Sequence, residues 1–372
     1  MSIKLPKVLV TYASAGAGHR KAAEAVYNYL KINFPGLDLA ICDVLDKTNP
    51  AFKLSYNRGY LFLVAHALWL WGVFFYLTSL KFIGPVLRAL IFFVNRVNAE
   101  PFIRYLAGQK FDFIISTHFL SAELAAYAKK AFCPGLKIIT SITDFDVHPF
   151  WISQGTDIYV VASGITQQTL IDKGVKEANI RQFGIPTEEK FLKTFRKDEL
   201  CAKLGLDKEK FTVLIITGSF GIGPIEELVS SLHDGLQVLV VCANNKGLYG
   251  RLKAKNYPNT RIFGFIDNVQ ELMAVSDIAV TKPGGLSISE AMVMELVPIF
   301  ISPIPGQESG NIDVMNRYGI GFHVRDTEEI KRIIFDFKAH PEKISEIKMK
   351  IRKIKKPDAA KEISNVIRQG NL

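Results

Sequence analysis

The stretch 281–311, TKPGGLSISEAMVMELVPIFISPIPGQESGN, constrains the fold of this chain more than any other part of the sequence. An apolar strand is expected over 278–280, a glycine turn over 282–285 and a second apolar strand over 299–301. A helix is expected directly after the turn, and a polar loop after the second strand. This order predicts a βαβ unit with a glycine turn at the start of its helix.

The glycine turn suits a ligand that carries a diphosphate. Gly284 and Gly285 let backbone N–H groups approach a ligand closely, and the first turn of a helix adds unpaired N–H donors and a partial positive charge. The simpler alternative is a tight turn in which Ser287 and Ser289 cap the helix. Carboxylate and amide side chains nearby favour a binding site, because such groups bind diols and sugar hydroxyls. The candidate ligand-binding residues of the stretch are Gly284, Gly285, Ser287, Glu290, Gln307, Glu308 and Asn311.

The chain is long enough for two ordinary domains. It has 372 residues, of which 48% are hydrophobic and 22% charged, as expected of a folded globular protein. Its four cysteines lie far apart without a CxxC pair, so neither a zinc site nor a disulfide framework is expected, and a reducing compartment fits best. The first residues lead directly into a strand, so no export signal is expected.

A second glycine-rich turn follows the first predicted strand. A strand over 8–11, the turn SAGAGH over 14–19 and a following helix resemble the start of a dinucleotide-binding fold, with Asp43 where a ribose-binding acid would lie. However, Lys21 occupies the place of the third glycine, and no GK[ST] follows that would make a P-loop. The turn instead presents the His19 imidazole at the carboxyl end of a strand, where α/β sheets bind ligands. A histidine at a helix start can also be only a polar neighbour of the cap.

The segment 51–105 combines long apolar runs with basic residues. It holds six lysines and arginines against one acidic residue, Glu100, in a chain whose net charge is +10. This combination is typical of a membrane surface rather than of a nucleic-acid site. The uncharged run 59–80 is just long enough to span a bilayer, but its basic flanks on both sides favour helices that lie in the interface, and an ordinary buried hairpin remains open. The residues expected at the membrane are Trp69, Trp71 and Phe75.

Other strand ends also carry candidate ligand-binding groups. Two predicted strands of the first half are followed by His118 and by TDFDVHPFW over 143–151. Asp144-x-Asp146 formally matches a manganese-binding DxD, but two acids at this spacing are common by chance, so no metal is expected. The second half again alternates strands and helices, and its glycine loop over 217–224 suits a phosphate.

Four motifs together resemble one family of enzymes. The blocks KPGGLSISEA and PIPGQESGN, the opening SAGAGHRKAAEA and the loop TDFDVHPFW resemble the monogalactosyldiacylglycerol synthases and processive diacylglycerol glucosyltransferases, relatives of MurG in glycosyltransferase family 28. The resemblance covers 8–324 and implies an α/β protein with the GT-B fold, in which two Rossmann-like domains face each other across a cleft. The expected parts are an acceptor and membrane-binding domain over 1–186, a donor-binding domain over 187–330, and basic helices over 331–372 that pack back toward the first domain.

The resemblance also implies an activity, the inverting transfer of a hexose from UDP-glucose or UDP-galactose to the hydroxyl of 1,2-diacylglycerol at the cytoplasmic face of a membrane. The expected partners are the UDP-sugar, diacylglycerol and anionic membrane lipid, without nucleic acid, cofactor or metal. By the family pattern His19 is the base and Asp144 assists it. Glu290 would bind the ribose, and Gln307 with Glu308 the hexose. The further residues implied are Gly218, Gly221, Phe265 and Asn311 for the donor, and Gly18, His118, His148 and Trp151 for the acceptor.

Three alternatives stay open at this point. A nicotinamide-dinucleotide oxidoreductase would explain Gly16, Gly18 and Asp43 but would leave the GQE motif without a role. A MurG-like transferase of UDP-N-acetylglucosamine to another lipid acceptor would share the fold and the donor turn. A membrane-binding protein with a degenerate transferase fold would keep the apolar segment without turnover.

Overall fold

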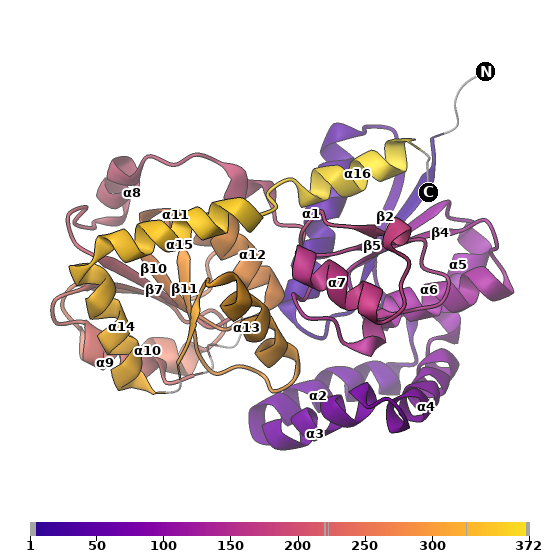
Figure 1. Cartoon of the computed structure of the whole chain (residues 1–372), viewed down its shortest axis with the longest axis horizontal. Helices are drawn as coiled ribbons and strands as arrows, with labels where there is room; N and C mark the ends of the chain where they lie inside the picture. Colours follow the sequence, from indigo (N-terminus) through magenta and orange to yellow (C-terminus); the bar gives the residue numbers. More distant parts are fainter. Residues whose placement is uncertain (1–4, 219–220, 222, 325, 370–372) are drawn as a thin grey trace. The chain divides into compact units, whose positions relative to one another are not determined.

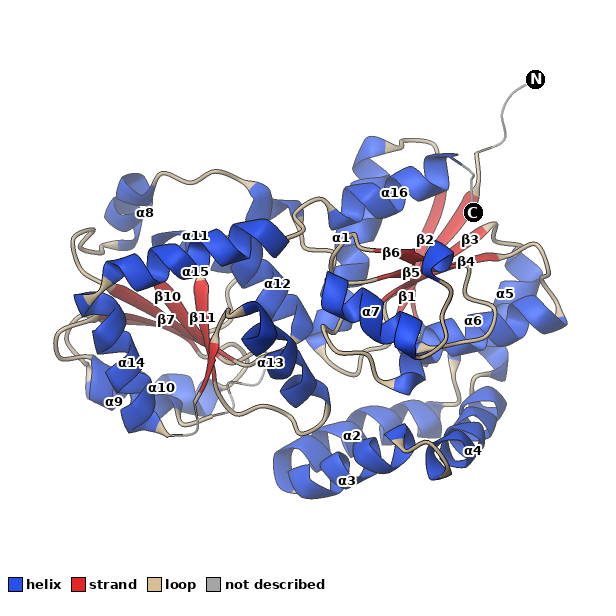
Figure 2. Ribbon diagram, viewed as in Figure 1, coloured by secondary structure: helices blue, strands red, loops and turns tan. Residues whose placement is uncertain are grey.

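The computed structural model describes residues 5–218, 221, 223–324 and 326–369. The chain forms two compact units. The first comprises Met1–Glu189, Ile304–Gly310 and Lys356–Leu372, and the second comprises Lys190–Pro303 and Asn311–Lys355. Each unit is built around its own parallel sheet with helices on both faces (Figure 1, Figure 2).

The sheet of the first unit has six strands in the order β2-β1-β3-β4-β5-β6, all parallel. Its central strands are mostly buried because helices cover both faces. The order reverses between β1 and β3, and ligands of open α/β sheets bind at the carboxyl ends of the strands at such a point. The strands are β1 (Lys7–Tyr12), β2 (Asp38–Asp43), β3 (Phe113–Ser116), β4 (Lys137–Ser141), β5 (Ile158–Val160) and β6 (Ile180–Arg181).

Helices from both ends of the chain cover this sheet. Ala23, Val26 and Leu30 of the first helix pack in one core with Ile363 and Ile367 of the last. The end of the chain therefore completes the first unit (Figure 1). The covering helices are α1 (Ala17–Asn33), α5 (Glu100–Gln109), α6 (Phe119–Ala131), α7 (Gly164–Asp172) and α16 (Ala359–Gln369).

Three further helices of the first unit, α2 (Pro50–His66), α3 (Leu68–Ser79) and α4 (Ile83–Asn98), form the apolar segment expected from the sequence (Figure 1). Asn49 caps α2 through a hydrogen bond from the Ala51 N–H. No single helix among the described residues is long and apolar enough to cross a membrane. The pair Pro50–Val64 and Leu68–Ser79 reaches that length and hydropathy only together, and it is bent by 112°.

Large apolar side chains on these three helices are exposed. These helices contact one another, so the exposed apolar side chains are gathered on neighbouring elements instead of scattered singly as on most soluble surfaces. Such a grouping marks an interaction site. We name it the apolar face. Its members are Leu54, Phe62, Leu68, Trp69, Leu70, Val73, Phe74, Tyr76, Phe82, Ile83, Val86, Leu90, Phe93, Val94 and Val97.

The sheet of the second unit also has six parallel strands, in the order β12-β11-β10-β7-β8-β9. Here the order reverses between β7 and β10, which pair along their whole length up to Ile216 and Thr281. The loops that follow these two strands therefore emerge side by side at one edge of the sheet. The strands are β7 (Thr212–Ile216), β8 (Gln237–Val241), β9 (Thr260–Phe263), β10 (Ile278–Thr281), β11 (Val297–Phe300) and β12 (Phe322–His323).

The helices of the second unit confirm the predicted βαβ unit, since α12 connects β10 to β11. One expectation was wrong: the polar segment that begins at Gln307 is not a loop but the start of α13, whose first residues belong to the first unit. In the basic C-terminal run, Arg352 and Lys355 form ion pairs with Glu295. The helices are α8 (Lys197–Leu204), α9 (Ile225–Leu232), α10 (Lys246–Lys255), α11 (Val269–Val275), α12 (Gly285–Val293), α13 (Gln307–Tyr318), α14 (Thr327–Ala339) and α15 (Pro341–Ile354).

Candidate active site

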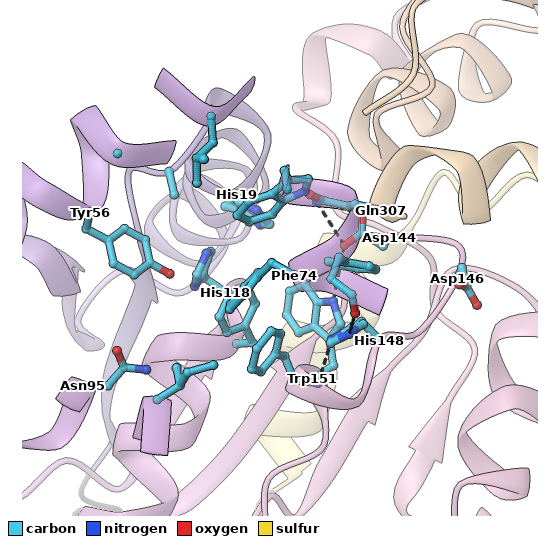
Figure 3. A pocket seen from close by; sticks show the side chains of 18 of the residues that line it. His19, Tyr56, Phe74, Asn95, His118, Asp144, Asp146, His148, Trp151 and Gln307 are labelled. Carbon is cyan, nitrogen blue, oxygen red and sulfur yellow. Dashed lines mark hydrogen bonds between the residues drawn. The ribbon is translucent and has the colours of Figure 1, made fainter. Parts of the chain in front are cut away.

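A cavity of about 330 Å³ lies in the first unit, where the segments that follow β1, β3 and β4 come together (Figure 3). These segments contribute His19, His118 and Asp144. Residues of α2, α3 and α4 supply most of the apolar lining. Figure 3 shows Tyr56 with Asn95 on one side of the cavity and Asp144 with Gln307 on the other. The sheet's reversal point thus carries a largely apolar pocket with a few polar groups, the usual form of a small-molecule site.

His19 lies in the first turn of α1, and its ring is held at one nitrogen. Its Nδ1 lies 3.0 Å from the Thr117 carbonyl oxygen and 2.8 Å from the Thr143 hydroxyl. A carbonyl oxygen can only accept, so Nδ1 carries the proton and Nε2 keeps its lone pair. Burial lowers the pKa of His19 to about 4, so the ring is neutral at neutral pH. A neutral imidazole with an available lone pair can act as a general base.

The backbone around His19 is fixed from two sides. Gly16, the residue before α1, has a φ of 122°, a conformation that L side chains rarely adopt. The Thr117 hydroxyl donates to the His19 carbonyl oxygen at 2.8 Å, while the Thr117 carbonyl accepts from the His19 ring. The histidine therefore cannot leave its place without breaking two contacts with the end of β3.

Asp144 is the centre of a small hydrogen-bond network. Its carboxylate accepts from the Trp151 indole N–H at 3.3 Å and from the Gln307 amide at 3.4 Å. The neighbouring Asp146 packs against Gly310, where an added Cβ would lie 2.4 Å from the Asp146 carboxylate. Among the described residues, no group of three or more His, Cys, Asp or Glu side chains is placed to hold a metal ion. The network shows how 304–310 is joined to the loop 143–151.

His148 uses both ring nitrogens within the protein. Its Nδ1 accepts from the Phe150 N–H at 3.2 Å, so Nε2 carries the proton and donates to the Phe75 carbonyl at 3.1 Å. Burial lowers the pKa of His148 to about 4. These contacts tie the end of α3 to the loop 143–151, a structural task in addition to the expected contact with the acceptor.

This arrangement predicts a loss of stability on acidification. The pKa of His148 is about 4 in the folded state, below its ordinary value of 6.5. The contribution of the neutral His148 ring to the free energy of unfolding is therefore complete above pH 6.5 and is lost as the pH falls toward 4. The loss should be roughly 3 kcal/mol at most. Urea unfolding of His148→Gln across this range should show a weaker pH dependence than the parent chain. Parallel curves for the two proteins would contradict the assignment.

The three aromatic residues expected at the membrane take two different positions. Trp69 is 72% exposed and belongs to the apolar face. Trp71 and Phe75 instead line the cavity, and Phe75 also packs against Gly306, where an added Cβ would lie 2.4 Å from its ring. Helix α3 therefore has one side toward the solvent-exposed apolar face and another toward the pocket.

The two glycine loops of the second unit follow the adjacent strands β7 and β10. Gly218 and Gly221 have φ angles of 77° and 55°. At Gly221 a Cβ would also lie 3.0 Å from the Cys242 carbonyl, so a larger residue would strain the loop. Residues 219, 220 and 222 of the predicted phosphate loop lie outside the described residues. Gly284 immediately precedes α12, whose first turn supplies the N–H groups expected to bind a diphosphate.

Two of the other residues expected at the donor form side-chain hydrogen bonds with the backbone. Asn311 is fully buried and donates to the Pro283 carbonyl at 3.0 Å, which fixes the glycine turn. Glu308 accepts from the Ile304 N–H at 2.7 Å, which fixes the start of α13. Glu290 and Ser287 are partly buried on α12, and Phe265 is 66% exposed after β9.

Sequence reasoning missed several polar residues around the pocket. Thr117 holds His19 and belongs to none of the recognised motifs, and the same is true of Tyr56 and Asn95 in the pocket wall. Thr143, which also holds His19, begins the motif TDFDVHPFW but was given no role. Only the position of the two threonines directly after strands could have drawn attention to them. Asp43 has a local task, because it accepts from the Ser14 and Leu45 N–H groups, which accounts for an acid at this strand end without a dinucleotide.

Comparisons with known proteins agree with this arrangement. Residues 19–187 match the family described as monogalactosyldiacylglycerol (MGDG) synthase, and residues 212–362 match the glycosyltransferase family 28 C-terminal domain. The chain is 29% identical over 374 residues to a processive diacylglycerol beta-glucosyltransferase of Bacillus cereus (strain ATCC 10987 / NRS 248), covering 98% of this chain and 94% of that protein. It is also 29% identical over 378 residues to the protein of that name from Bacillus thuringiensis (strain Al Hakam), covering 99% and 95%.

Solved structures of low sequence identity share the fold. MurG of Acinetobacter baumannii aligns with a TM-score of 0.62 at 14% identity, covering 98% of this chain and all of that one. Anabaena Alr3699/HepE, solved with UDP, aligns with a TM-score of 0.58 at 15% identity and covers 98% and 100%. The two six-stranded parallel sheets with their helices thus form the GT-B fold expected from the sequence. The chain is a glycosyltransferase whose first half belongs to the monogalactosyldiacylglycerol synthase family and whose second half belongs to the glycosyltransferase family 28 C-terminal domain family.

Proposed function

We propose that this enzyme transfers a hexose from a UDP-sugar to the free hydroxyl of 1,2-diacylglycerol, with inversion at the anomeric carbon. The observation that carries the proposal is His19, a neutral imidazole whose Nδ1 is occupied, in the wall of a largely apolar pocket. Such a pocket suits the glycerol end of a lipid, and the ring supplies the base that an alcohol nucleophile needs.

The proposed reaction is one displacement. The hydroxyl proton of the acceptor passes to His19 Nε2 while the acceptor oxygen bonds to the anomeric carbon. The bond from that carbon to the diphosphate oxygen breaks, and UDP leaves with the electron pair. The contacts of Asp144 with Trp151 and Gln307 support a positioning role for this carboxylate, in place of the direct assistance to the base expected from the sequence.

The second unit would hold the donor. The glycine turn after β10 and the first turn of α12 would present N–H groups to the diphosphate, and a helix N-terminus favours an anion by up to about 2 kcal/mol. Gly218 and Gly221 after β7 would let a second backbone segment approach the same group. Glu290 would accept from the ribose diol, and the exposed ring of Phe265 would contact the uracil. These groups can stabilise the leaving diphosphate without taking part in proton transfer.

The apolar face would rest on the cytoplasmic membrane surface and admit the lipid to the pocket. Four cations of the segment 51–105 have partners within the protein. Lys53 pairs with Asp46 and Arg104 with Glu100, Arg96 lies over a tyrosine ring, and Arg88 donates to a backbone carbonyl. Arg58 and Lys81 remain exposed and can attract anionic lipid. Attachment would therefore be peripheral and depend more on apolar contact than on charge.

The test is a direct assay with each sugar. Labelled UDP-glucose, UDP-galactose and UDP-N-acetylglucosamine would be incubated with vesicles that contain diacylglycerol, and the lipid product analysed by NMR at the anomeric proton. The names of the relatives favour a β-glucosyl product. An α-linked product would exclude inversion of the α-linked donor, and transfer of N-acetylglucosamine alone would favour the MurG-like alternative.

Glu290→Ala should weaken binding of the donor more than it slows the chemical step. The variant loses an acceptor for the ribose hydroxyls while His19 stays in place, and hydrogen bonds to a charged group contribute roughly 1.5–3 kcal/mol, about a ten- to hundred-fold change in affinity. Calorimetric titration with UDP measures the effect. Glu342→Gln, an exposed acid in the first turn of α15, is the matched control. Equal UDP affinity in Glu290→Ala and the parent chain would rule out the ribose contact.

A further inference from the structure

A second histidine lies directly beside the proposed base. The rings of His19 and His118 meet edge to face with 4.6 Å between their centroids, and both line the cavity (Figure 3). His118 is almost completely buried. A neutral imidazole donates a hydrogen bond from one ring nitrogen and accepts at the other. What the two rings can bind together therefore depends on which nitrogen of each carries the proton.

The backbone sets the tautomer of His118. The residue caps α6, and its Nδ1 lies 3.1 Å from the Leu120 N–H, which can only donate. Burial holds the pKa of His118 well below its ordinary value, so the ring is neutral and its single proton lies on Nε2. His19 has the opposite arrangement, because the Thr117 carbonyl accepts from its Nδ1–H.

The two Nε2 atoms therefore differ in their hydrogen-bonding capacity, since one is an acceptor and the other a donor. That of His19 has a lone pair, and that of His118 has a proton. Within the residues that the structure describes, neither Nε2 has a hydrogen-bond partner, since the contacts of both rings run through Nδ1. Both histidines line the cavity, so a ligand there can supply the missing partners.

We propose that His19 and His118, fixed in opposite tautomers, bind one acceptor hydroxyl at two points. The hydroxyl donates to His19 Nε2 and accepts from His118 Nε2–H. The second lone pair of the acceptor oxygen then remains for attack on the anomeric carbon. His118 is in this account a positioning residue that selects a group able to donate and accept at once, and the inference rests on the proposed transfer to an alcohol.

Two substitutions separate this role of His118 from its role as a helix cap. His118→Asn keeps an oxygen that can accept from the Leu120 N–H, but it lacks the donor at the position of Nε2. His118→Gln retains an amide N–H that reaches the position of Nε2, but it is a poor cap. The comparison therefore changes the two contacts one at a time.

We expect His118→Asn to keep its melting temperature and its affinity for UDP while kcat/KM for diacylglycerol in vesicles falls about two- to thirteen-fold, the range of one neutral hydrogen bond. His118→Gln should melt a few degrees lower and keep more of its kcat/KM. Normal kcat/KM in His118→Asn would overturn the proposal.

Nitrogen-15 NMR of the histidine rings at neutral pH gives a result independent of activity. The expected spectrum has the proton of His19 on Nδ1 and that of His118 on Nε2. The same tautomer in both rings would overturn the two-point contact. Normal turnover in His19→Ala would contradict the role of His19 as the base. The spectrum of the parent chain would still decide whether the two rings have opposite tautomers.

Discussion

Replacing His19 by alanine should lower kcat about 10²- to 10⁴-fold, the usual contribution of a general base. The imidazole is the group in the pocket whose lone pair is set free by contacts on its other nitrogen. Its removal leaves the acceptor hydroxyl without a place for its proton. The second unit, which would bind the donor, is not changed, so calorimetry should find the same affinity for UDP.

The control for this variant is His340→Ala, which removes an exposed imidazole between α14 and α15. It should keep the turnover of the parent chain. Near-normal turnover in His19→Ala would transfer the role of base to another group of the pocket. A loss of UDP affinity or of the folded state would show instead that the substitution acts on the structure.

The pH dependence of the rate provides a second measure of the same assignment. The pKa of His19 lies at about 4, so the ring is neutral above this pH and accepts a proton from solvent below it. The acid side of the profile of kcat/KM should therefore be flat down to about pH 5 and fall near 4, rather than fall at the ordinary 6.5 of histidine.

The sequence predicted the parts of the fold that depend on local pattern. The glycine turn at Gly284 between two apolar strands has one plausible geometry, and the structure has the βαβ unit there, with α12 between β10 and β11. The chain between 304 and 310 shows the limit of such reasoning. Its polar residues looked like a loop, but they begin α13, and Gln307 donates to Asp144, which lies 163 residues away in the sequence.

The sequence predicted a residue of the candidate site only where a motif gave that residue a role. His19 follows a recognisable glycine turn, whereas Thr143 and Thr117 gain their role because β3 and β4 end beside α1. The pattern also did not tell which side of a helix faces the pocket. Trp69 and Trp71 are two residues apart, which on a helix separates them by more than half a turn, and this places one outside and the other in the pocket wall.

The second large effect is expected on membrane binding, when residues of the apolar face are replaced. Replacing Trp69, Tyr76 and Phe82 together by serine should lower binding to vesicles about 100-fold. All three side chains are mostly exposed, and none lines the cavity. Full burial of a large apolar side chain contributes roughly 1.5–3 kcal/mol, so partial insertion of three at about 1 kcal/mol each gives roughly 3 kcal/mol. Flotation with vesicles of phosphatidylcholine and phosphatidylglycerol measures the change.

The same variant separates the membrane contact from the active site. Its affinity for UDP should stay, while turnover with diacylglycerol in vesicles falls together with binding. Ile32→Ser, which removes an exposed apolar residue of α1, should have no such effect. High salt should weaken binding of the parent chain less than the triple substitution does, because salt screens the exposed Arg58 and Lys81 but not the apolar contact. Vesicle binding by the triple variant equal to that of the parent chain would show that another surface holds the membrane.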